Sequence, residues 1–145
     1  MIMTENELSN YPSSYILCFV DGCKLKDNCI HYLAGQHVRD DDNMGYAVYP
    51  SVLKSADGCK WHKEYRVIKS AWGFDTLFHS VLQRHAATLR QQIKDYLGGN
   101  GTYSRYNRGE RRLTPEQQEW MIRLFQKYGY TTNLLFDHYE DAVDW

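Results

Sequence analysis

The spacing of hydrophobic residues separates this chain into a first half of short apolar runs and a second half with helical periodicity. In the first half, residues 15–20, 46–49 and 64–68 are rich in aromatic and β-branched side chains, which favour strands. The second and third runs flank a turn signal at Asp57, so we expect them to pair, with Cys59 at the tip of their connection. These runs predict a small antiparallel sheet.

A short helix is expected between the first two runs. Residues 26–34 fit a helix that begins near Asp27 or Asn28 and ends at Gly35. Such a helix would place Cys29 in its first turns, where the helix dipole favours a thiolate.

The second half has the clearest periodicity. Over residues 74–96 the apolar side chains recur at helical spacing, which predicts one long helix that ends at a glycine-rich segment. Another helix is expected after Thr114, because Thr114, Pro115 and Gln117 match the N-cap, N1 and N3 positions of a capping box. A third, shorter helix is predicted over residues 132–143.

These elements predict a single α+β domain of 145 residues. Residues 1–14 would be a flexible N-terminus, and residues 15–73 a cysteine-bearing half with short strands. Residues 74–145 would form a helical half, in which two to three helices pack against the sheet. A chain of this length buries about 68 to 70% of the surface that its unfolded form exposes, so a cross-link is not strictly required.

Charge and composition narrow the function. The formal net charge is -1 at pH 7, which argues against a globally basic nucleic-acid binder. No run approaches the roughly 18 apolar residues of a membrane span. The first residues also lack the charged start and apolar core of a secretory signal. We therefore expect a cytoplasmic protein with no membrane partner, in which thiols stay reduced.

The four cysteines are the main candidate for a chemical site. Cys18, Cys23, Cys29 and Cys59 follow the spacing C-x(4)-C-x(5)-C-x(29)-C. Four thiolates complete a closed structural zinc site, and they also hold an iron–sulfur cluster, so the spacing does not separate the two. The simpler alternative is four ordinary cysteines, among which Cys18 is a small buried hydrophobic residue.

Histidines near the cysteines open two further interpretations. His31 follows Cys29 by two positions and His62 follows Cys59 by three, so a mixed set of cysteine and histidine ligands is one variant. Either histidine would alternatively act as the base that activates its neighbouring cysteine for catalysis.

A basic and aromatic stretch at residues 103–112 is the candidate partner surface. It carries four arginines against Glu110, which gives a local charge of +3. Guanidinium groups suit phosphates, and tyrosine rings stack on bases. The alternative is that the arginines pair internally with the acidic C-terminal segment. The predicted contact residues are Arg105, Arg108, Arg111, Arg112, Tyr103 and Tyr106.

With these residues in view, the chain resembles a family of small uncharacterised proteins from Bacteroides and related gut bacteria, classed as a domain of unknown function. The resemblance covers nearly everything after Tyr11. The family implies no established activity and no catalytic residues, but it implies that the cysteines and the Arg-Gly-Glu stretch are family features. The positions that carry the resemblance are Cys18, Cys23, Cys29, Tyr49, Pro50, Cys59, Arg108, Gly109, Glu110, Leu113, Pro115, Glu116, Gln117, Gly129, Tyr130, Phe136, Asp137, Tyr139 and Trp145.

The leading hypothesis is a cytoplasmic, non-enzymatic binding module that is stabilised by zinc and binds an acidic or nucleic-acid partner. Its predicted contact surface is the stretch at residues 103–112. The alternative is an enzyme of unknown substrate that uses an activated cysteine or a metal-bound water.

Overall fold

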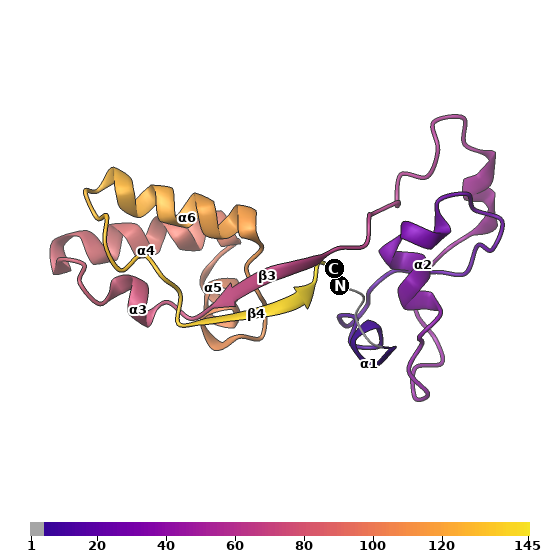
Figure 1. Ribbon diagram of the computed structural model, residues 1–145, viewed down its shortest axis with the longest axis horizontal. Coiled ribbons are helices and arrows are strands. Elements are labelled where there is room, and N and C mark those ends of the chain that lie inside the picture. Colours follow the sequence, from indigo (N-terminus) through magenta and orange to yellow (C-terminus); the bar gives the residue numbers. More distant parts are fainter. Residues whose placement is uncertain (1–4) are drawn as a thin grey trace. The chain divides into compact units, whose positions relative to one another are not determined.

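The computed structural model describes residues 5–145, and the side chains from Glu7 onward. The chain divides into two compact units, which are shown in Figure 1. The N-terminal unit contains the chain up to Val67 together with Val143–Trp145, and the helical unit is Ile68–Ala142. The division falls a few residues before the boundary that the sequence pattern suggests between the two halves, and the last three residues belong to the first unit.

The N-terminal unit is built from short elements joined by long loops. Its strands β1 and β2 form a two-stranded parallel sheet, in which Leu17 is paired with Ala47 and Cys18 with Val48. Helix α2 packs closely on β1 at Gly35, where an added Cβ atom would lie 2.3 Å from the carbonyl oxygen of Cys18. The elements are α1 (Glu5–Leu8), β1 (Leu17–Cys18), η1 (Lys26–Asn28), α2 (Ile30–Gly35), β2 (Ala47–Val48) and η2 (Pro50–Lys54).

Three small hydrophobic clusters hold the N-terminal unit. Each has only three buried residues, and partly buried side chains pack around it. Val143 is a buried member of one cluster, and Trp145 packs against two of them. The Asp144 carboxylate accepts a hydrogen bond of 2.6 Å from Arg66. The buried members are Leu8, Ile30 and Val143, then Tyr11, Leu17 and Ala34, and finally Cys18, Val20 and Val48.

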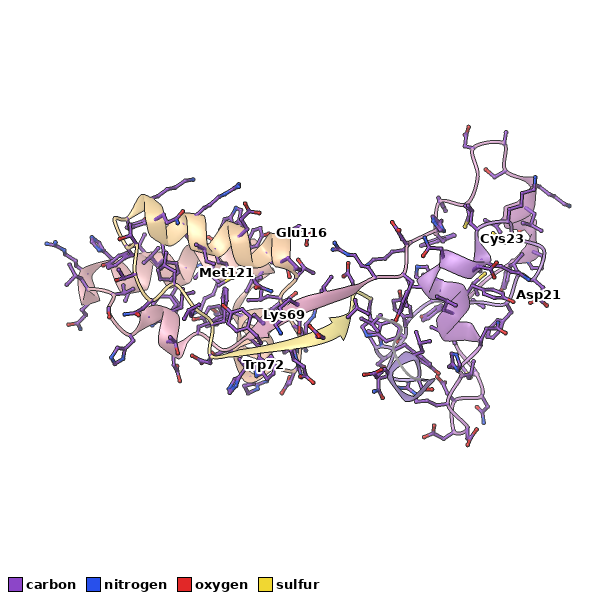
Figure 2. The ribbon with its side chains drawn as sticks, in the orientation of Figure 1. Asp21, Cys23, Lys69, Trp72, Glu116 and Met121 are labelled. Carbon is purple, nitrogen blue, oxygen red and sulfur yellow. The ribbon has the colours of Figure 1, made fainter. Side chains whose placement is uncertain are left out.

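The helical unit surrounds one larger core of twelve buried residues, which include Met121 on α6 (Figure 2). Helix α4 contacts both α5 and α6. Strands β3 and β4 form an antiparallel pair beside the helices, as Figure 1 shows. The elements are β3 (Val67–Trp72), α3 (Asp75–Phe78), α4 (Gln83–Leu97), α5 (Asn100–Arg108), α6 (Pro115–Lys127) and β4 (His138–Val143). The helices and small sheets confirm the predicted α+β class.

The capping box predicted before α6 is confirmed. The Thr114 hydroxyl accepts a hydrogen bond from the Gln117 backbone N–H, and the Gln117 side chain accepts one from the Thr114 N–H. Two of the N–H groups that a helix start leaves without partners are thereby satisfied, so α6 begins where the sequence predicts.

The single helix predicted over residues 74–96 is wrong, because the chain breaks between α3 and α4. The break is stabilised by a side chain distant in sequence. The Tyr130 hydroxyl accepts a hydrogen bond of 3.0 Å from the Leu82 backbone N–H and lies 2.7 Å from Nδ1 of His85. Leu82 is consequently extended and precedes α4 as its N-cap residue.

The third helix predicted over residues 132–143 is also wrong. Asn133 has a left-handed backbone with φ of 59°, and residues 138–143 form strand β4 instead. Asp137 lies before this strand and caps α3, since its carboxylate accepts hydrogen bonds from the backbone N–H groups of Thr76 at 2.7 Å and Asp75 at 3.1 Å. Burial raises the pKa of the Asp137 carboxyl, but these hydrogen bonds lower it more, so the net shift is downward from 3.8.

The hairpin expected between residues 46–49 and 64–68 does not form. Strand β2 is paired with β1, and β3 begins only at Val67 and is paired with β4. The helix expected over residues 26–34 is divided into η1 and α2, which makes Cys29 the N-cap residue of α2 rather than part of its first turn. Residues 100–108, which lie within and just after the glycine-rich segment, form helix α5.

No helix within residues 5–145 combines the length and the hydrophobicity that crossing a bilayer requires.

Candidate metal centre

All four cysteines of the N-terminal unit line one small cavity. Cys18 ends β1, Cys23 lies on the loop that follows (labelled in Figure 2), and Cys29 precedes α2. Cys59 comes from the loop after η2. The cavity has a volume of about 20 Å³, which is enough for one water-sized species. The fold therefore brings together four thiols from segments up to 41 positions apart in the sequence.

The charges of the other three cysteines act on the Cys18 thiol. Burial raises the pKa of the Cys18 thiol, a hydrogen bond from the Val20 backbone N–H lowers it, and the charges of the other three cysteines raise it further. The Cys23 sulfur accepts a hydrogen bond of 3.4 Å from the Leu25 backbone N–H. Cys18 and Cys23 thus share one local arrangement, in which the amide two residues later points at the sulfur.

The cysteines are all free thiols. Among the side chains of the described chain, no three histidine, cysteine, aspartate or glutamate residues are placed so that they hold a metal ion as they stand. Four thiolates so close together would repel one another, so they need a cation or protons between them. Metal binding at this site would therefore require deprotonation and a further approach of the sulfurs.

The walls of the cavity are mostly apolar and aromatic. Sequence reasoning did not single out these wall residues, because only the fold shows that they lie around the sulfurs. Lys26 is the one lysine near the cysteines in sequence that also lines the cavity, where its charge would offset that of thiolates. The other wall residues are Val20, Tyr32, Val48, Val52 and Trp61.

Two histidines complete the lining. Nδ1 of His31 lies 2.7 Å from the carbonyl oxygen of Ile16, and its ring stacks on Tyr15 with centroids 4.9 Å apart. Nδ1 of His62 is buried and has no hydrogen-bond partner among the described residues. Within the same part of the chain, no hydrogen bond joins a cysteine thiol to a histidine ring, so the geometry does not favour a thiolate activated by a neighbouring base.

The arginines of residues 103–112 belong to the helical unit, where they lie on α5 and on the loop after it. Arg108 donates hydrogen bonds to Glu110 at 3.0 Å and to Ser104 at 2.7 Å. Arg112 donates to Glu140 at 2.7 Å, and its guanidinium lies over the Trp72 ring, 3.8 Å from the centroid. Part of the internal pairing that the sequence suggested as an alternative is thus present.

The remaining members of this stretch differ in exposure. Tyr106 is buried in the core, and Tyr103 packs against the same core. Arg111 is exposed and lies over the Tyr106 ring at 5.4 Å from the centroid. Arg105 is exposed as well. The hydrogen bond from Arg108 lowers the pKa of the Glu110 carboxyl, and the charge of Arg105 lowers it further.

The rings of Tyr103 and Tyr106 pack in or against the core, so they are less available to a partner than the exposed arginines are.

A family model described as a family of unknown function, DUF6078, matches residues 1–145. The chain belongs to this family. The match confirms the resemblance to a domain of unknown function, and it extends over both units. Comparison with curated proteins and comparison with solved structures both give no match. Membership of DUF6078, a family of unknown function, identifies neither an activity nor a ligand.

Proposed function

We propose that this member of DUF6078 is a binding module whose N-terminal unit is organised by a structural zinc ion on Cys18, Cys23, Cys29 and Cys59. The observation that carries the proposal is that one small cavity is lined by all four cysteines of the chain. Zinc accepts four thiolates in a closed tetrahedral site, which leaves no open position for a substrate.

The composition of the N-terminal unit gives a physical reason for such a centre. The unit comprises 67 residues plus the last three, and its buried residues are divided among three separate clusters. Units of this size rarely obtain more than about 3 to 5 kcal/mol from a single hydrophobic core, and natural examples add disulfides or a structural metal. Because the cysteines are free, a metal is the cross-link that this unit has available.

The chemical surroundings also suit thiolate ligands. Backbone N–H groups point at the sulfurs of Cys18 and Cys23, and hydrogen bonds of this kind stabilise a thiolate. Reduced thiols are the normal state in the cytoplasm, so we place the protein there. The same sulfurs suit an iron–sulfur cluster, which metal analysis distinguishes from zinc.

Metal analysis of the purified full-length protein tests this proposal. We expect one zinc per chain without added metal, and loss of the folded N-terminal unit when a strong chelator removes it. Iron and inorganic sulfide in place of zinc would change the identity of the centre. Protein that is folded, free of metal and reactive at four thiols would overturn the proposal.

We further propose that the module binds an anionic partner through the exposed arginines of α5, with Arg105 and Arg108 as its first contacts. Arg105 supports this assignment because its side chain is exposed beside the Arg108–Glu110 pair. A phosphate displaces the exposed Glu110 carboxylate from the Arg108 guanidinium at little cost, because an ion pair between solvent-exposed side chains contributes little to stability.

Two double variants test the arginine surface. Arg105→Gln with Arg108→Gln removes the proposed contacts, and Arg84→Gln with Arg123→Gln removes two other exposed arginines of the same unit. Binding of a single-stranded oligonucleotide and of polyglutamate is measured as a function of salt. We expect only the first variant to weaken binding, and its salt slope with the single-stranded oligonucleotide to fall by about 1.4. Equal binding by both variants, or no binding by the parent protein, would refute this surface.

A further inference from the structure

One buried atom of the cysteine cavity has no partner. His62 lines the cavity, and its Nδ1 is buried without a hydrogen-bond partner among the described residues. An unsatisfied buried polar atom destabilises the folded state, and native proteins seldom contain one without a reason. The other histidine of the cavity shows the normal situation, because Nδ1 of His31 lies 2.7 Å from the Ile16 carbonyl oxygen.

Metal binding would create the acceptor that His62 lacks. A neutral thiol is a weak acceptor, whereas a thiolate accepts a charge-assisted hydrogen bond. Four thiolates on one zinc ion carry two net negative charges, which are costly in a cavity with mostly apolar walls. Cys18 and Cys23 already have backbone N–H groups directed at their sulfurs. The hydrogen bonds of the described residues include no such donor to Cys29 or Cys59.

We propose that His62 donates its Nδ1–H to the metal-bound thiolate of Cys59 and so stabilises the centre from outside the ligand set. Cys59 is the acceptor because the two residues share one turn, in which the His62 backbone N–H donates to the Cys59 carbonyl oxygen at 3.2 Å. The four cysteines complete a closed tetrahedral set, which leaves His62 as a positioning residue and not a ligand. This inference rests on the metal centre proposed above.

Two substitutions at His62 separate hydrogen bonding from packing. His62→Leu removes the donor, and His62→Asn keeps an N–H group close to the position of Nδ1. The full-length variants are compared for zinc affinity by competition with a chelator, for the absorption spectrum of the Co²⁺-loaded form, and for the alkylation rate of Cys59. We expect His62→Leu to lower zinc affinity about 10- to 100-fold and to speed alkylation of Cys59, and His62→Asn to restore most of both. The Co²⁺ spectrum should indicate four sulfur ligands in all three proteins.

Several outcomes would overturn the inference while the metal centre stands. Equal zinc affinity in the parent protein and His62→Leu would show that Nδ1 makes no contribution. A parent Co²⁺ spectrum of three sulfurs and one nitrogen, lost in His62→Leu, would make His62 a ligand instead. If His62→Leu does not fold, His62→Asn is compared with His62→Gln, whose amide lies near the position of Nε2; equal affinity of these two refutes the inference. A parent protein that binds no metal removes the centre and this inference together.

Discussion

The two units differ in how they bury hydrophobic surface. The helical unit has one cluster of twelve buried residues and helices of up to 15 residues. In the described part of the N-terminal unit, three clusters share nine buried residues, and the longest helix has six residues. The apolar area that the helical unit buries in its continuous core is enough to stabilise it. The N-terminal unit buries less in each cluster and needs a further cross-link between its segments.

This contrast predicts that different perturbations unfold the two units. The helical unit should be sensitive to cavities in its core and insensitive to chelators. The N-terminal unit should show the opposite behaviour, because each of its clusters contributes little by itself. The following predictions are ordered by the size of the expected effect.

Loss of the metal should have the largest effect. Structural zinc provides roughly 10 to 16 kcal/mol of apparent binding free energy near pH 7, which is also folding free energy. We therefore expect Cys29→Ser, or chelation of the parent protein, to abolish amide-exchange protection in the N-terminal unit and leave that of α4 and α6. Chelation with excess zinc is the control. Unchanged protection in both units, or equal loss in both, would break the comparison.

Truncation of a side chain in the core of the helical unit should have the second-largest effect. Phe125 is fully buried and packs edge-on against Phe78, with ring centroids 5.2 Å apart. Phe125→Ala should lower the free energy of unfolding of the helical unit by about 3 to 5 kcal/mol, because it leaves a cavity. Leu135→Ala is the control, since Leu135 is 55% exposed and its truncation should change stability by less than about 0.5 kcal/mol. Urea denaturation measures both, and equal effects would contradict a continuous core.

Two glycine variants test how closely the Asp137 side chain, which caps α3, approaches the backbone at Gly73. Gly73 and Gly129 both have left-handed backbones, with φ of 84° and 91°. A Cβ atom on Gly73 would lie 2.5 Å from Oδ2 of Asp137, whereas one on Gly129 would meet no atom within 4 Å. Both alanine variants incur backbone strain of about 1 to 2 kcal/mol. Gly73→Ala should cost about 1 to 3 kcal/mol more because of the clash. Thermal unfolding that ranks the two variants equally would argue against the close approach.

The pH dependence of Asp137 should give the smallest effect. Its carboxyl pKa is lowered in the folded state, so its contribution is complete above about pH 4, its ordinary range. The contribution is lost as the pH falls through the lower, folded pKa. We expect Asp137→Asn to be about 1 kcal/mol less stable than the parent protein at pH 6, and the difference to shrink below pH 4. A difference that is constant from pH 6 to pH 2.5 would show that the charge is irrelevant.

Local signals in the sequence predicted some elements well. Helix α6 was predicted because Thr114, Pro115 and Gln117 determine its start by contacts within four residues. The end of α4 was predicted by its glycines, of which Gly98 has φ of 103°. Helix α5 was missed because the glycines beside Asn100 suggest a loop, although Tyr103 and Tyr106 have helical spacing and Gly109 marks the end.

Other elements depend on contacts that no local pattern contains. The break before α4 uses Tyr130, and the cap of α3 uses Asp137, which lies 61 residues after Thr76. Strand β4 forms because β3 is available as its hydrogen-bonding partner. The sequence of β4, which includes Glu140, Asp141 and Ala142, does not show this partner, so the segment was predicted as a helix. For the cysteines, the sequence predicted the members of the set. Their convergence on one cavity, and the buried Nδ1 of His62, became visible only in the fold.

The membership of Val143–Trp145 in the N-terminal unit has a consequence for biosynthesis. A ribosome synthesises residues 68–142 before Val143–Trp145. The helical unit is therefore complete before the N-terminal unit, although the N-terminal unit comes first in the sequence. The cluster that Val143 forms with Leu8 and Ile30 is therefore incomplete throughout that interval. Of the two units, the second one translated is the first that can finish folding.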